Sequence, residues 1–161
     1  MKQIRRNVFE TNSSSTHSIT YSKHYIKCTN NIEVDEIDNK VHVCLGEFGW
    51  EIDSHEDSST KLQYLITYVC AQNGLTTWWS EDGFDEKVVE LRSLEDFKNI
   101  EECVKDELGC DGIEIDSLDG YIDHQSLYGS NLQEYFDYEG VSNLYEYIFG
   151  NIIVHTDNDN H

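Results

Sequence analysis

The spacing of hydrophobic side chains predicts an amphipathic helix over residues 59–72. Five apolar residues recur there every three or four positions: Leu62, Leu65, Ile66, Val69 and Cys70. This spacing places them on one face of a helix, which we expect to be the buried face. One of residues 58–60 can cap the first turn, and Gly74 can end the helix.

The same spacing predicts a second helix over residues 94–108. Its buried stripe would consist of Phe97, Ile100, Val104 and Leu108. Ser93 can cap this helix, and Gly109 can end it. Two shorter helices are predicted over 132–138 and 143–149, with Asn131 and Ser142 as caps.

Alternating or short apolar runs predict the strands. They lie at 8–9, 17–21, 40–45 and 152–155, with a short hairpin formed by 113–116 and 121–123. Strands near both ends with helices between them are typical of an α+β domain. We therefore expect a single compact domain with a small, mostly antiparallel sheet, N- and C-terminal strands, and two to four helices.

The charge is large and unevenly distributed. The 161 residues include 32 carboxylates and 11 Lys or Arg, a formal net charge of −21. A nucleic-acid coat protein would present a basic face, so this charge excludes that class. Residues 1–27 hold five basic residues and one acid, whereas residues 106–161 hold thirteen acids and no Lys or Arg. The sequence thus predicts one domain over 1–161, with a basic, polar head and an acidic, tyrosine-rich C-terminal third.

The composition also bears on the compartment. No apolar run approaches the ~20 residues of a membrane span, and residues 1–10 lack the apolar stretch of a secretory signal. The five cysteines include no Cys-x-x-Cys pair, so neither a disulfide framework nor a zinc ribbon is indicated. We expect a cytoplasmic protein with no membrane partner.

Residues 10–18 form a run of nine polar side chains, of which seven carry hydroxyls or amides. Such donors beside arginines suit a phosphate group, and an imidazole there could move a proton. The candidate nucleic-acid-binding residues are Arg5, Arg6, Asn12, Ser13 and Ser14. The candidate catalytic residues are Glu10, Ser15, His17 and, from another segment, His124. The alternative is a surface loop rich in side-chain turns, with His17 beginning a strand.

His124 stands between Asp123 and Gln125. Together with His17 it could supply the base and the acid that cleave a phosphodiester without a metal. The alternative is that Asp123 begins a loop and His124 is a surface side chain.

The C-terminal third offers two further interpretations. Oxygen ligands for a divalent cation could come from Asp116, Asp119, Asp123, Asp157 and Asp159, with His155 and His161 nearby. None of these fits an EF-hand spacing, so no cofactor is assigned and the metal site stays unknown. Rows of carboxylates interleaved with tyrosines could instead imitate phosphates in a basic groove, or simply form a solvated face.

Three short segments resemble known sequences: residues 6–18 (RNVFETNSSSTHS), 123–126 (DHQS) and 156–159 (TDND). They are similar to a group of small proteins encoded by phages and mobile elements of low-GC Gram-positive bacteria. Anti-CRISPR proteins occur among such phage proteins, including ones that cause loss or truncation of the guide RNA. The resemblance implies action in a bacterial host cell, with an RNA-guided nuclease or its guide RNA as partner.

Three hypotheses follow. The first is an anti-defence protein that cleaves or displaces guide RNA through the Ser/His loop. A chain of charge −21 repels free RNA, so such a ribonuclease would depend on a basic partner to deliver its substrate. The second is an acidic inhibitor without chemistry. The third is a phage accessory protein without a nucleic-acid partner.

Overall fold

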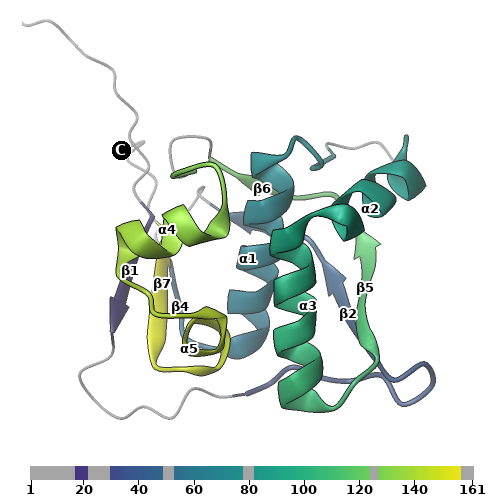
Figure 1. Cartoon of the computed structure of the whole chain (residues 1–161), viewed down its shortest axis with the longest axis horizontal. Coiled ribbons are helices and arrows are strands. Elements are labelled where there is room, and N and C mark those ends of the chain that lie inside the picture. The colour runs from purple at the N-terminus through teal and green to yellow at the C-terminus, as the bar shows by residue number, and fades with distance from the viewer. Residues whose placement is uncertain (1–16, 22–29, 49–52, 78–81, 124–126, 157–161) are drawn as a thin grey trace, which may run out of the picture.

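The computed structural model describes residues 17–21, 30–48, 53–77, 82–123 and 127–156 (Figure 1). The described strands are β1 (Ser18–Tyr21), β2 (Lys40–Cys44), β3 (Glu47–Phe48), β4 (Asp53–His55), β5 (Gly112–Ser117), β6 (Tyr121–Ile122) and β7 (Ile152–Thr156). The described helices are α1 (Ser58–Gln72), α2 (Phe84–Ser93), α3 (Glu95–Leu108), α4 (Leu132–Glu139) and α5 (Leu144–Phe149). The predicted α+β class is confirmed, with α2 as the helix that the apolar spacing did not indicate.

The described strands form three small sheets rather than one. β1, β7 and β4 make an antiparallel sheet in which the first and last described strands are neighbours. β2 pairs with β5, and β3 with β6, both in parallel, because α1, α2 and α3 lie in the connections between the partners. The predicted hairpin of 113–116 with 121–123 is therefore wrong.

Gly120 permits the close approach of the two connections that join these parallel pairs, residues 45–46 between β2 and β3 and residues 118–120 between β5 and β6. A Cβ atom at this position would lie 2.5 Å from Cβ of Leu45 and 2.9 Å from the carbonyl oxygen of Gly46. The same carbonyl accepts a hydrogen bond from the N–H of Tyr121 at 2.9 Å. A side chain at residue 120 would push the two segments apart and break this contact.

Helix α1 lies at the centre of the molecule, with α3 beside it (Figure 1). The antiparallel sheet, α4 and α5 flank α1 on one side, and β2, β5 and α2 lie on the other. The predicted apolar face is buried, but so is most of the opposite face. The buried residues of α1 are Ser58, Lys61, Leu62, Tyr64, Leu65, Ile66, Thr67, Tyr68, Val69 and Cys70.

The buried polar side chains of α1 each bind a different part of the chain. Lys61 Nζ donates to the carbonyls of Gly150 and Ile152, at the junction of α5 and β7. Thr67 Oγ1 accepts from the N–H of Gly46 at 3.0 Å. These bonds compensate for the loss of water around each group, so a helix surrounded by protein carries polar residues at tolerable cost.

The helix ends follow the expected chemistry with local shifts. Asp57 caps α1 by accepting a hydrogen bond from the N–H of Thr60. The cap therefore lies one residue before residues 58–60, the predicted capping residues. Ser93 does not cap α3: it is the last residue of α2, and its hydroxyl donates to the carbonyl of Glu90. Asn143, rather than Ser142, caps α5. No helix among the described residues is long and apolar enough to cross a membrane.

We predict that Tyr68→Phe lowers the free energy of unfolding by about 1–3 kcal/mol. The Tyr68 hydroxyl donates to the carbonyl of Tyr128 and accepts from the N–H of the same residue at 2.8 Å. Phenylalanine keeps the ring but leaves that N–H without this acceptor. Urea unfolding followed by circular dichroism measures the change.

Tyr138→Phe is the matched control, because Tyr138 is 65% exposed and stacks on Tyr128 from outside. We expect it to change stability by less than about 0.5 kcal/mol. Equal stability of the Tyr68→Phe protein and the wild type would contradict the importance of this hydrogen-bond pair.

Candidate functional site

Most of the predicted site lies outside the described residues. This holds for Arg5, Arg6, Glu10, Asn12, Ser13, Ser14, Ser15 and His124, and for the possible metal ligands Asp157, Asp159 and His161. Their roles stay predictions. The structure does place His17, the last residue of the polar segment before β1, and His155, which lies on β7.

His17 is buried, with 2% of its surface exposed. Its Nδ1 atom lies 2.8 Å from the hydroxyl of Tyr64 on α1, and the two rings pack at 5.8 Å between centroids. This contact fixes the start of β1 against the central helix. In this position the imidazole serves packing, and its proposed proton transfer would require substrate access to a buried group.

A cluster of buried tyrosines surrounds this contact. Tyr64, Tyr135 and Tyr147 are each almost fully buried, and burial raises the pKa of all three hydroxyls well above the ordinary value. The hydroxyls therefore stay protonated at neutral pH and act as hydrogen-bonding groups rather than as bases. Glu139 lies at the edge of the cluster, and its pKa is also raised by burial, although it accepts from the N–H of Ile19 at 3.1 Å.

A row of hydroxyls and one imidazole crosses the outer face of the antiparallel sheet. Alternate residues of β7 are buried, which leaves His155 on the outer face. Ser54 Oγ on β4 lies 2.8 Å from His155 Nδ1, and Thr20 Oγ1 on β1 lies 2.6 Å from His155 Nε2. The strand that follows the polar N-terminal segment is thereby joined to His155.

This row has the first element of nucleophilic catalysis, a hydroxyl within hydrogen-bond distance of an imidazole. The second nitrogen of His155 meets the Thr20 hydroxyl where many catalytic sites place a carboxylate. The sequence indicates His155 only as a possible metal ligand. The row is not predictable from the sequence, because Thr20, Ser54 and His155 are far apart in the chain and only strand register brings them together.

The outer face of β2 and β5 carries a second polar cluster in which cations are neutralised. Lys40 binds Glu114 at 2.8 Å, and Arg92 of α2 binds Glu101 at 3.3 Å and Glu114 at 3.4 Å. The Lys40 ammonium, as a hydrogen-bond donor, lowers the pKa of Glu114. These pairs leave little positive charge available on this face.

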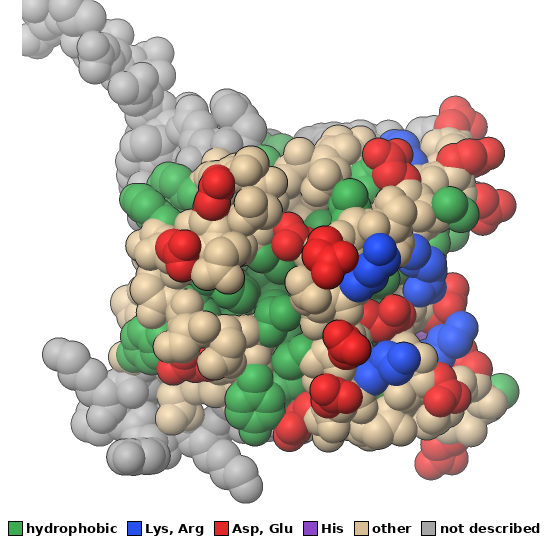
Figure 2. Space-filling view, in the orientation of Figure 1, with side chains coloured by type: hydrophobic (Ala, Val, Ile, Leu, Met, Phe, Trp, Pro, Cys, Tyr) green, Lys and Arg blue, Asp and Glu red, His purple; other side chains and the backbone are tan. Residues whose placement is uncertain are grey.

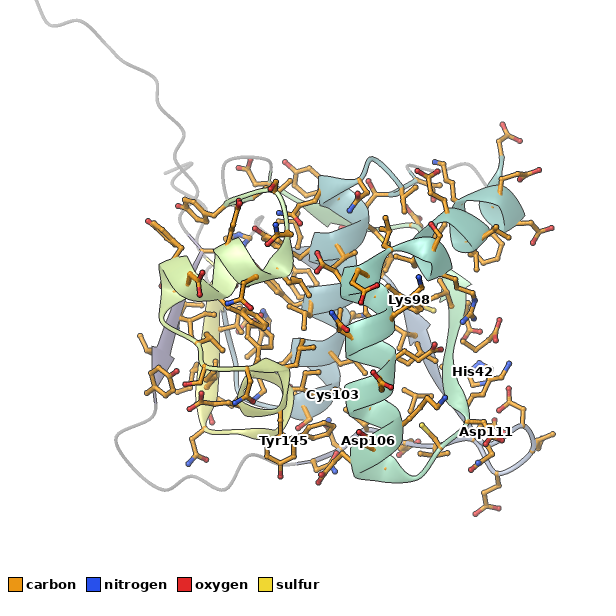
Figure 3. The ribbon with its side chains drawn as sticks, viewed as in Figure 1. His42, Lys98, Cys103, Asp106, Asp111 and Tyr145 are labelled. Carbon is orange, nitrogen blue, oxygen red and sulfur yellow. The ribbon has the colours of Figure 1, made fainter. Side chains whose placement is uncertain are left out.

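His42 on the same face lies between two carboxylates. Its Nδ1 is 2.9 Å from Asp116, and its Nε2 is 3.2 Å from Asp38. The hydrogen bond to Asp116 is the main cause that raises the pKa of His42 above its ordinary value, with Asp38 adding to it. Figure 3 places His42 on the β2–β5 side, away from Cys103 and Tyr145 on the α3–α5 side.

The surface as a whole is dominated by carboxylates. The described residues include 27 Asp or Glu and six Lys or Arg, and one of these six, Lys61, is buried. In Figure 2 the blue side chains gather over the α2, α3 and β5 side, with many red ones among them, whereas the charged side chains visible over α4 and α5 are all red. The described part of the chain contains no group of three or more His, Cys, Asp or Glu arranged to hold a metal ion.

Comparison of the chain with known protein families, with curated proteins and with solved structures gives no match.

We predict that His42 titrates above the ordinary value of 6.5 and that Asp116→Asn lowers its pKa. The asparagine keeps the shape of the partner but removes its charge. Because the folded pKa is raised, the stabilisation by His42 is fully present below about pH 6.5 and is lost as the pH rises through the folded pKa. Histidine ring resonances followed by NMR against pH measure the shift.

Asp119→Asn is the control for that titration, since it removes an exposed carboxylate from the neighbouring turn, whereas the carboxylates that bind His42 are those of Asp38 and Asp116. The pKa of His42 should move less in this variant than in Asp116→Asn. An unchanged midpoint in Asp116→Asn would refute the assigned ion pair.

Proposed function

We propose that the protein is an anti-defence inhibitor whose acidic surface occupies a basic, nucleic-acid-binding groove of a bacterial RNA-guided nuclease complex. The observation that carries this proposal is the charge of the described residues, 27 carboxylates against six Lys or Arg. The resemblance of residues 6–18 to phage and mobile-element proteins supports the choice of partner.

The acidic α4–α5 surface is the best candidate for the contact. It is defined by Glu134, Asp137, Tyr138, Tyr145 and Glu146. Its two tyrosines are 65% and 52% exposed and offer rigid contact area between the carboxylates. Residues 127–156 contain no Lys or Arg, so nothing on these helices repels a basic groove.

The exposed carboxylates of this surface carry the same sign of charge as the phosphates of a nucleic-acid backbone. A groove that binds phosphates with Lys and Arg is complementary to both, so the protein would compete with nucleic acid for it. Long-range attraction would also raise the rate of association. No proton transfer or cofactor is needed for inhibition of this kind.

Guide-RNA cleavage is the second proposal, and the Ser54–His155–Thr20 row favours it. The row presents an imidazole on the sheet to which the polar N-terminal segment leads. In that version residues 10–18 and His124 supply the remaining groups. The enzyme would act only when a basic partner delivers the RNA, because free RNA is repelled.

We predict that the purified protein blocks target-DNA binding by a guide-loaded nuclease while the guide stays intact. Titration at rising salt should weaken the inhibition strongly, because exposed charges are screened beyond ~8 Å at physiological ionic strength. The double variant Asp137→Lys with Tyr138→Ala should lose at least about tenfold in affinity, or about 1.4 kcal/mol.

The matched control is Glu90→Lys with Val89→Ala on α2, which makes the same charge change and truncates a residue that is 70% exposed. It should retain most of the affinity. Inhibition that does not change with salt would overturn the electrostatic mechanism. A guide shortened by the wild type but not by His155→Gln would establish the enzyme instead. No binding at any salt would leave only an accessory protein.

A further inference from the structure

The segment before β2 and the strand β2 itself form a hairpin that closes only at its turn. The N–H of Asp35 donates to the carbonyl of Lys40 at 2.8 Å, and the N–H of Asn39 donates to the carbonyl of Asp35 at 2.9 Å. Asn39 adopts a φ of 55°, a left-handed conformation that asparagine tolerates and that the tight turn requires. Beyond this turn the two arms separate.

The separated arms enclose a groove of about 390 Å³. Five consecutive residues of the first arm, 31–35, and four consecutive residues of the second, 41–44, form its walls. The first turns of α1 form its floor through Ser59, Leu62 and Gln63. If side chains alone formed a wall, only every second residue of the strand would border the groove. Because consecutive residues do so on both arms, the backbone edges also border it.

Strand alternation gives the direction of these backbone groups. The N–H of Leu45 binds the carbonyl of Ser117, so the odd-numbered residues of β2 direct their backbone groups toward β5. The carbonyl of Lys40 points the other way, toward Asp35, and His42 shares its orientation. Among the described strands β2 pairs only with β5, so the backbone of His42 lines the groove without a strand partner.

Two side-chain hydrogen bonds hold the arms apart. Asn31 Oδ1 accepts from the N–H of Ser59 at 3.0 Å, which ties the first arm to the start of α1. Gln63 Nε2 donates to the carbonyl of Cys44 at 2.9 Å, which ties the second arm one turn further along the helix. The groove is thus held open by hydrogen bonds between its two walls and its floor on α1.

The geometry points to a binding site for an extended, Lys- or Arg-containing protein segment that enters the groove as an added strand. Asp35 directs its N–H and its carbonyl toward the second arm, and Glu33, two residues earlier, shares that orientation. The main chain of the segment would therefore bind the backbone groups of residues 33 and 42 on the two walls. Its alternate side chains would face the floor near Leu62 and the solvent, where Glu33, Asp35, Asp38 and Asp116 favour positive charge. This inference rests on the proposed function for the basic character of the partner.

Among the described residues that line the groove, His42 is the one that can carry a positive charge. It faces Asp38 across the turn and Asp116 on β5, while Lys40 beside it is bound to Glu114. The charges around the mouth therefore remain negative in sum even when His42 is protonated. A cationic segment is preferred over an anionic one throughout the neutral range.

The experiment uses the whole protein, labelled with ¹⁵N, and a capped hexapeptide of alternating Lys and Val. We expect shifts of the backbone amide signals of Glu33 and His42, and little change on α4 and α5. A peptide N-methylated at alternate residues loses the main-chain donors along one edge and should bind about tenfold more weakly, the effect of one or two hydrogen bonds. A Glu-Val peptide should not bind.

Two variants, Glu33→Lys and His42→Pro, test the two walls of the groove. Glu33→Lys reverses one wall charge without touching the backbone and should weaken the Lys-Val peptide at least about fivefold, or about 1 kcal/mol. His42→Pro removes the N–H in the groove, and circular dichroism checks that it folds. Equal binding of the plain and N-methylated peptides, or shifts confined to α4 and α5, would overturn the site.

Shifts of Glu33 and His42 that depend on protein concentration without peptide would make a second copy the occupant and overturn the proposal. The peptide assay contains no nuclease, so its outcome is separate from that of the proposed function. Peptide binding with an unaffected nuclease would retain the groove and reject the anti-defence role. Nuclease inhibition without peptide binding would retain the anti-defence role and reject the groove as a binding site.

Discussion

The fold depends on a helix that is surrounded by protein on nearly all sides and is nevertheless not wholly apolar. Helix α1 buries Lys61, Tyr64, Thr67 and Tyr68 as well as its aliphatic face. Each polar group must recover the hydrogen bonds that water would have made, or the burial costs several kcal/mol. The surrounding segments are held in position because they supply those partners.

The partners come from widely separated parts of the chain. Tyr64 meets His17 ahead of β1, Thr67 meets the connection after β2, Tyr68 meets the backbone of Tyr128, and Lys61 meets the start of β7. The ammonium of Lys61 also lies where the carbonyls of α5 end, a position that favours a positive charge. One helix therefore positions both the sheet that carries His155 and the segment that borders the groove.

Local chemistry explains what the sequence predicted well. The apolar stripes of α1 and α3, the left-handed Gly109 that ends α3, and the capping Asn131 of α4 all depend on neighbours within a few residues. The burial of the opposite face of α1 was not predictable, because amphipathic spacing gives no means to foresee partners for Lys61 and Tyr68. The parallel pairings of β2 and β3 depend on crossovers that local pattern does not encode.

The candidate site was less predictable for the same reason. His17 was chosen for its polar neighbours in sequence, yet the structure buries it against Tyr64, a residue of the predicted helix. The Ser54–His155–Thr20 row arises from strand register, and the groove arises from two arms tied separately to α1. Each is a property of tertiary placement, whereas the acidic charge could be read directly from composition.

The pairing of β1 with β7 has a consequence for how the chain is made. Ser18 lies opposite His155, so this sheet can form only after nearly all of the described chain has left the ribosome. Until then the buried residues Ile152 and Val154 of β7 cannot complete the core, and Lys61 of α1 lacks the carbonyl of Ile152 as its partner. Closing so long a loop is entropically slow, and exposed apolar surface invites chaperones or association in the interval. The excess of negative charge would keep these unfinished chains apart from one another during synthesis.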